Sequence, residues 1–269
     1  MACLSIDDIS TYVTKLDEME LTGGYGIVYK ASVTTKARSV FPLQLPNVVA
    51  VKQMRVVSET VRRVIQNEIR ILACLTLRHS VKYYGCLSRG TEMYLIMEWA
   101  EGYELGEILN NEDVYLPHGL KQDIALELAI GIQELHTAGI AHRDIKVDNV
   151  MFSLKNGALD GLKIIDYGYA CTTGTCLEDL YTREYRDPWV VAGNFESLLQ
   201  ADWYAYGVTL LLLYQQSFAR CYNRRNTPAF IRVLLESAPR DRPSFTDMIT
   251  ALIRRRSPRS TVSDRTSSA

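Results

Sequence analysis

A dense run of charged and polar side chains extends from His142 to Asn149. It contains one histidine, two cations, two carboxylates and an amide, and apolar sequence lies on both sides. Charged groups in apolar surroundings cost free energy unless they are paired or bind a ligand. A second segment of this kind, Asp166-Tyr167-Gly168, follows further along the chain. The two segments indicate a site that binds a ligand or reacts with a substrate.

The elements around these segments divide into a strand-rich half and a helix-rich half. Runs of β-branched and aromatic residues separated by turn residues predict strands; these runs cover 27–29, 48–51, 81–84 and 93–96. Apolar residues at helical spacing predict helices; these cover 59–74, 120–137, 202–214 and 228–236. The change of character near residue 100 predicts two lobes.

We therefore expect an α+β fold with a small β-rich N-lobe over residues 14–97 and a larger helical C-lobe over 103–253. Residues 98–102 would form the hinge, and ligands often bind at such clefts between lobes. Residues 1–13 are polar and mixed, which predicts a poorly ordered lead-in. Residues 254–269 form a basic Ser/Arg-rich tail without apolar residues, which predicts disorder.

The composition is that of an ordinary globular protein, with 47% hydrophobic and 23% charged residues. The net charge of −1 gives no reason to expect a nucleic-acid partner. We find no secretory signal in residues 1–15 and no apolar run near the roughly 18 residues of a membrane span. The expected location is intracellular, in the cytoplasm or nucleus, without membrane contact.

The cysteines are scattered rather than grouped. They are Cys3, Cys74, Cys86, Cys171, Cys176 and Cys221. Because none forms a Cys-x-x-Cys pair, neither a zinc site nor a disulfide framework is expected. The prediction is reduced thiols in a reducing compartment.

The segment around Gly23, Gly24 and Gly26 has the composition of a strand, a turn and a second strand. Glycines there let backbone N–H groups approach a phosphate without obstruction by Cβ atoms. A plain hairpin turn is the alternative interpretation. The segment by itself therefore indicates phosphate binding only weakly.

Lys52 ends an apolar strand, and the helix that follows offers it a partner. Val61, Ile65, Glu68 and Leu72 are spaced four, three and four apart, so they share one helix face. Burying a carboxylate in such an apolar stripe without a partner costs on the order of several kcal/mol in desolvation free energy. The sequence therefore predicts an ion pair between Lys52 and Glu68.

In this order, the glycine segment, Lys52, Glu68, the run 142–149 and Asp166-Tyr167-Gly168 resemble the eukaryotic-type protein kinases. The resemblance covers roughly residues 14–253 and is to the serine/threonine type, in a compact and divergent form. It implies a bilobal kinase fold, ATP as phosphate donor with Mg²⁺ (Mn²⁺ as an alternative), and a protein substrate. The implied activity is transfer of the γ-phosphate to a serine or threonine hydroxyl.

The resemblance also implies roles for the catalytic residues. Asp144 would accept the proton of the acceptor hydroxyl, and Lys146 would stabilise the γ-phosphate. Lys52, held by Glu68, would bind the α- and β-phosphates. Thr182 would bond to Asp144 and Lys146 and shape the pocket just after the phosphoacceptor.

For the metal, the resemblance implies Asn149 and Asp166 as ligands. His142 would pack inward rather than titrate in catalysis. Asp202 would tie the start of a buried helix back to the catalytic loop. For the nucleotide it implies a wider set: Leu21, Gly23, Gly24, Gly26, Val28, Ala50, Lys52, Met97, Glu98, Ala100, Glu104 and Met151. Leu21 stands where the family has the first glycine of its loop.

The sequence departs from the family pattern at Asp187-Pro188-Trp189, where kinases carry Ala-Pro-Glu. The glutamate normally pairs with a late arginine, here Arg242. Asp187 or a nearby acid substitutes for it, or the segment is looser. This departure and the altered glycine loop favour, slightly, the alternative of a pseudokinase that serves as a nucleotide-binding scaffold or regulator. A small-molecule acceptor is a third hypothesis, against which Lys146 and Thr182 argue.

Two further expectations concern substrate and regulation. Glu104 and Asp148 occupy positions where basophilic kinases bind arginines, which predicts a mild preference for basic residues before the acceptor; solvated surface is the alternative. Glu178 and Asp179 stand near the usual phosphorylation site. A carboxylate there would pair with Arg143 and mimic phosphate, which predicts activity without an upstream kinase.

Overall fold

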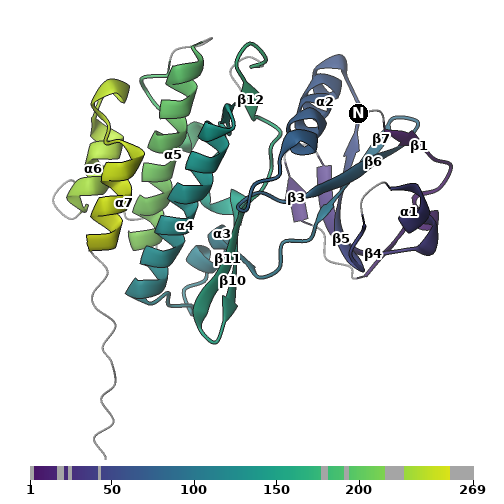
Figure 1. Cartoon of the computed structure of the whole chain (residues 1–269), viewed down its shortest axis with the longest axis horizontal. Coiled ribbons are helices and arrows are strands. Elements are labelled where there is room, and N and C mark those ends of the chain that lie inside the picture. Colours follow the sequence, from purple (N-terminus) through teal and green to yellow (C-terminus); the bar gives the residue numbers. More distant parts are fainter. Residues whose placement is uncertain are drawn as a thin grey trace, which may run out of the picture.

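The computed structural model describes residues 3–16, 21–23, 26–41, 44–176, 181–190, 194–215 and 227–254. Two lobes are visible in Figure 1, with the large sheet and α2 on one side and α4 to α7 packed side by side on the other. This is the predicted bilobal α+β fold. Within the described residues, no helix has the length and apolar character needed to cross a membrane.

A seven-stranded sheet forms the N-lobe, in the order β1-β6-β7-β5-β4-β2 with β3 paired to β4. All pairs are antiparallel except β1 with β6. The strands are β1 (Leu4–Ser5), β2 (Val13–Lys15), β3 (Leu21–Gly23), β4 (Gly26–Val33), β5 (Val48–Arg55), β6 (Tyr83–Arg89) and β7 (Glu92–Glu98). The β5 register sets Lys52 opposite Val28 on β4 and Leu95 on β7, so its position in the centre of the sheet is fixed.

Helix α2 (Glu59–Cys74) matches the predicted range, and α1 (Thr35–Val40) is a short addition. Ser58 caps α2, because its side chain accepts a hydrogen bond of 3.2 Å from Val61 N. The buried side of α2 carries Ile65, Leu72 and, between them, Glu68. The helix therefore delivers a carboxylate into the interior of the lobe.

The C-lobe contains α3 (Leu105–Asn110), α4 (His118–Thr137), α5 (Phe195–Gln215), α6 (Ala229–Glu236) and α7 (Phe245–Arg254). Its short strands are β8 (Tyr103–Glu104), β9 (Ile140–Ala141), β10 (Val150–Lys155), β11 (Ala158–Ile164) and β12 (Cys171–Thr172). Single 3₁₀ turns are η1 (Ile9–Thr11), η2 (Val147–Asn149), η3 (Arg183–Tyr185) and η4 (Pro239–Asp241). Helix α5 begins at Phe195, earlier than predicted, because its first turn packs Leu198 against Ala141 and Cys171.

The N-terminus differs from the predicted lead-in. Residues 3–16 include β1, η1 and β2, and Ile6, Tyr12 and Val13 are buried in a core cluster with Phe41. These apolar residues are too scattered to show strand or helix periodicity, so only the sheet that they cover reveals their role. The tail from residue 255 lies outside the described residues.

The prediction of reduced cysteines is wrong for four of the six. Disulfides join Cys3 to Cys86 and Cys171 to Cys176. Spacing along the chain did not reveal the first pair, because β1 reaches β6 only in the folded sheet, where the two Cα atoms are 4.6 Å apart. Cys74 is free and exposed, and Cys221 lies outside the described residues.

Candidate active site

A cavity of about 400 Å³ lies between the lobes. Most of the predicted nucleotide, metal and catalytic residues line it: Val28, Ala50, Lys52, Glu68, Met97, Glu98, Ala100, Glu104, Lys146, Asn149, Met151 and Asp166. The other lining residues are Leu72, Val81, Trp99, Asp148, Ile165 and Tyr167, none of which was predicted to bind the nucleotide. The cavity is lined by apolar residues together with a smaller number of charged ones, as is usual for a small-molecule site.

The described residues of the glycine segment lie on two paired strands, one of which contributes Val28 to the lining of this cavity. Strand β3 pairs with β4, with Leu21 opposite Val28 and Gly23 opposite Gly26. A Cβ atom at Gly26 would lie 2.1 Å from the backbone oxygen of Gln53 on β5, so only glycine fits there. Gly24 lies outside the described residues.

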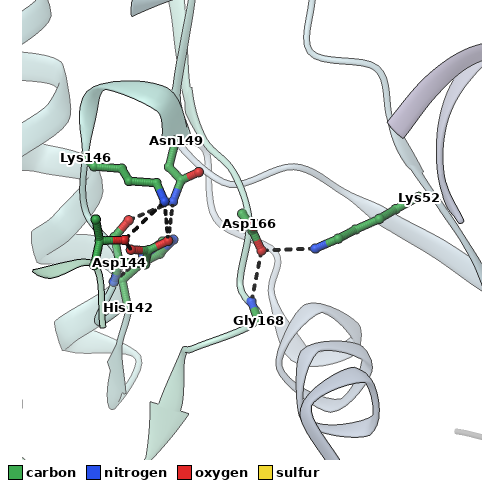
Figure 2. Close-up of polar contacts among 8 residues, drawn as sticks. Lys52, His142, Asp144, Lys146, Asn149, Asp166 and Gly168 are labelled. Atoms are coloured by element: carbon green, nitrogen blue, oxygen red, sulfur yellow. Dashed lines mark hydrogen bonds and ion pairs between the residues drawn. The ribbon is translucent and has the colours of Figure 1, made fainter. Parts of the chain in front are cut away.

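The predicted ion pair of Lys52 is present. Its Nζ lies 2.7 Å from Oε1 of Glu68 and 3.0 Å from Oδ1 of Asp166, and the second contact is drawn in Figure 2. Lys52 and Glu68 are both buried. Burial alone opposes the charge of Lys52, but the two carboxylates outweigh it and raise the pKa of this lysine, so the ammonium is retained. Through Lys52, the carboxylates of Glu68 and Asp166 connect α2 to the C-lobe.

Asp166 is held in an unusual backbone conformation, with a φ of 60°. Its Oδ1 accepts a hydrogen bond of 3.2 Å from Gly168 N (Figure 2). Burial opposes ionisation, but the charge and the hydrogen bond of Lys52 prevail and lower the pKa of Asp166. A non-glycine residue in this left-handed region costs about 1–3 kcal/mol, which the surrounding contacts must offset.

Three side chains converge on the carboxylate of Asp144. Thr182 donates from Oγ1 to Oδ1 over 2.5 Å, Asn149 donates from Nδ2 to Oδ2 over 2.9 Å, and Lys146 Nζ lies 3.0 Å from Oδ2. Asn149 Nδ2 also donates to the backbone oxygen of Asp144 over 2.8 Å. Figure 2 shows Asn149 and Lys146 approaching Asp144 from the same direction. The carboxylate therefore has a fixed orientation.

The loop that carries Asp144 is tied to α5 through Asp202. The carboxylate of Asp202 accepts hydrogen bonds from His142 N at 2.8 Å and Arg143 N at 2.7 Å, as the resemblance predicted. Arg143 has a φ of 67°, so this anchor coincides with a strained turn. His142 is fully buried, its ring lies 5.0 Å from that of Tyr167, and burial lowers its pKa. Its predicted inward packing is confirmed.

Asn149 and Asp166 have donor atoms suited to a divalent cation. Because Nδ2 of Asn149 is bonded to Asp144, its amide oxygen is turned away, toward the side of Asp166 in Figure 2. One amide oxygen and one carboxylate match Mg²⁺, which takes its remaining ligands from phosphate and water. The described residues contain no cluster of three His, Cys, Asp or Glu that would form an all-protein metal cage. The pair fits a metal that arrives with a nucleotide.

Asp187 takes the place of the missing glutamate partner. Its Oδ2 accepts a hydrogen bond of 2.7 Å from Nη1 of Arg242, and both side chains are fully buried. Of the alternatives that the sequence left open, substitution by Asp187 is the one observed. Glu178 and Asp179 lie outside the described residues, so their predicted contact with Arg143 stays a prediction.

Sequence reasoning missed Asn67, which precedes Glu68 on α2. Its Nδ2 donates to the backbone oxygen of Ala170 over 2.6 Å, and the residue is buried. Asn67 thus connects α2 to the segment that follows Asp166. The available signal was a polar residue beside Glu68 on the buried side of a predicted helix.

Comparison with known proteins agrees with this geometry. The family model described as protein kinase domain matches residues 22–228. This covers well over half of the chain, and the chain belongs to the protein kinase family. Within that family, the similar proteins carry the names of serine/threonine kinases.

A probable serine/threonine-protein kinase of Dictyostelium discoideum is 27% identical over 199 residues, covering 65% of this chain and 46% of its own length. The serine/threonine-protein kinase shk1/pak1 of Schizosaccharomyces pombe is 31% identical over 121 residues, covering 45% and 18%. The serine/threonine-protein kinase CLA4 of Candida albicans is 34% identical over 122 residues, covering 45% and 12%. The chain therefore spans less than half the length of these relatives.

Proposed function

We propose that this protein transfers the γ-phosphate of ATP to serine or threonine hydroxyls of protein substrates, with Asp144 as the catalytic base. The observation that carries the proposal is the arrangement of Thr182, Lys146 and Asn149 around the carboxylate of Asp144. An acceptor hydroxyl beside Asp144 would meet an oriented carboxylate, and Lys146 would neutralise charge developing on the phosphoryl group.

The nucleotide would occupy the cavity between the lobes. Val28, Ala50 and Met151 give it apolar walls for the base, and the backbone of Glu98 and Ala100 would bond to the adenine edge. Lys52 would bind the α- and β-phosphates, positioned by Glu68. Asn149 and Asp166 would hold Mg²⁺, which when bound screens the phosphate charge and orients the γ-phosphate.

A pseudokinase is the second hypothesis. The substitution at Leu21 and the Asp187–Trp189 segment motivated it. Against it, Asp187 restores the buried pair with Arg242, so that departure leaves the segment anchored. The contacts of Lys52, Asp144 and Asp166 also favour an enzyme over a scaffold.

The decisive experiment measures transfer of radiolabelled γ-phosphate to a generic protein substrate. Wild type should transfer phosphate, and Asp144→Ala and Asp166→Ala should each lose on the order of 100-fold or more in rate. Asp160→Ala, at an exposed acid on β11, is the matched control and should retain activity. ATP binding by the wild type without any Asp144-dependent transfer would favour the pseudokinase.

We also propose a preference for basic residues before the acceptor. The carboxylates of Glu104 and Asp148 both lie close to Gly106. A Cβ atom built on Gly106 would be 2.9 Å from Asp148 Oδ1 and 3.1 Å from Glu104 Oε1. Burial and the negative charges of Glu107 and Asp148 raise the pKa of Glu104 to about 7. A substrate arginine would relieve this repulsion. A peptide array that shows no preference for arginine before the acceptor would contradict the proposal.

An intracellular location stays a prediction.

A further inference from the structure

Two arginines follow Thr182 on a short turn beside Asp144. The turn η3 is closed by backbone hydrogen bonds from Tyr185 N to Thr182 O at 3.0 Å and from Arg186 N to Arg183 O at 3.3 Å. Side chains three residues apart eclipse one another in a 3₁₀ turn. Arg183 and Arg186 therefore leave the turn on the same side.

This turn is anchored at both ends and in the middle. Thr182 donates to Asp144 at one end, and Asp187 pairs with buried Arg242 at the other. Between them, Tyr185 is buried. Because the backbone is already fixed, a ligand that binds here has little ordering entropy to offset. Because Thr182 contacts Asp144, a substrate that places its hydroxyl beside Asp144 would lie close to this turn.

Both arginines are exposed. The guanidinium of Arg186 lies over the ring of Tyr181, 3.9 Å from its centroid, and donates a hydrogen bond to its hydroxyl. Tyr181 thus orients this cation without neutralising it. Within the described part of the chain, neither guanidinium forms an ion pair with a carboxylate. Glu184 is exposed, and its place one residue along the turn directs it to a different side.

We propose that Arg183 and Arg186 select substrates with an acidic side chain directly after the phosphoacceptor. This inference rests on the proposed kinase function and names part of its substrate class. A carboxylate there would accept charge-assisted hydrogen bonds from one or both guanidiniums. Glu104 and Asp148 would bind basic residues before the acceptor. The site would therefore recognise substrates with basic residues before the phosphorylated residue and an acidic residue directly after it.

The test compares peptides that differ only in the residue after the acceptor, which is Glu, Gln or Lys. With the wild type, kcat/KM should be about three- to tenfold higher for Glu than for Gln, as expected for exposed charge-assisted contacts. The ratio should fall as salt is raised. Arg183→Gln combined with Arg186→Gln should bring it near one. Arg240→Gln, at an exposed arginine in η4, is the matched control and should keep the wild-type ratio.

Charge reversal gives a second and stricter outcome. Arg183→Glu combined with Arg186→Glu should prefer the Lys peptide, a gain that misfolding cannot produce. Equal rates for Glu and Gln with the wild type, or an unchanged ratio in the double variant, would overturn the proposal. Peptides with alanine in place of the acceptor provide the same comparison by fluorescence anisotropy. If the protein shows no turnover, the phosphotransfer proposal is refuted. The ratio of the affinities for the Glu and Gln peptides still tests the role of Arg183 and Arg186.

Discussion

The guanidinium of Arg242 is bonded from Nη1 to the carboxylate of Asp187 over 2.7 Å, and neither side chain reaches solvent. Arg242 Nη1 also donates to the backbone oxygen of Gln200 over 2.7 Å. The contact joins the segment after η3 to η4 and α5. The sequence places these two residues far apart, and only their burial together gives the pair its importance.

Asp187→Ala should lower the free energy of unfolding by about 3–5 kcal/mol, because it leaves a buried arginine without its counter-ion. Chemical denaturation measures this loss. Asp187→Ala combined with Arg242→Met should be less destabilised than Asp187→Ala alone, since the unpaired charge is gone. Asp241→Ala, at an exposed acid close to Arg242 in sequence, is the control and should change little. Equal stability of Asp187→Ala and wild type would show that the pair is not structural.

Glu68→Gln should reduce kcat on the order of 100-fold, because Lys52 loses the charge that positions it toward the phosphates. Steady-state kinetics with a generic protein substrate measures the effect. Glu59→Gln, at the exposed start of the same helix, serves as control. A variant that keeps wild-type kcat would remove the Lys52–Glu68 pair from the mechanism.

The pH dependence of basic-substrate binding should follow Glu104. Because its pKa is raised from 4.5 to about 7, folding favours the protonated form. That contribution to stability is complete below the unfolded pKa and is lost as the pH rises through about 7. The negative charge appears over the same interval, so affinity for an arginine-containing peptide should rise between about pH 6 and pH 8.

Isothermal calorimetry with that peptide tests the pH dependence. A peptide with glutamine in place of arginine should show a weaker dependence, and Glu104→Gln should flatten the profile for both. A wild-type profile that is already flat would argue that Glu104 does not face the substrate.

Reduction should destabilise the protein, since four cysteines are paired. Cys3→Ser should cost about 2–5 kcal/mol under non-reducing conditions, because the Cys3–Cys86 bond closes a long loop. Thermal unfolding with and without reductant measures the effect, and Cys74→Ser, at an exposed free thiol, is the control. A non-reducing peptide map should recover both cross-linked pairs; fully alkylated cysteines would contradict the pairing.

Much of the site followed from local sequence. The helix over 59–74 and the ion pair of Glu68 with Lys52 came from apolar spacing alone, because a helix face with one carboxylate needs a counter-ion. Most of the residues that line the cavity were predicted from the family resemblance. The role of Asn67 was not predicted, since its hydrogen bond to Ala170 joins two segments that sequence periodicity cannot relate.

The sequence by itself determined the two lobes, the order of the motifs and the charges that meet in the cleft, because these depend on periodicity and residue type over short ranges. Only the tertiary structure decided that Asp187 replaces a missing partner of Arg242, that residues 3–16 complete the N-lobe, and that Cys3 reaches Cys86. It also set Arg183 and Arg186 on one side of an anchored turn beside Asp144. Each of these depends on distances between segments remote in sequence, which folding brings together.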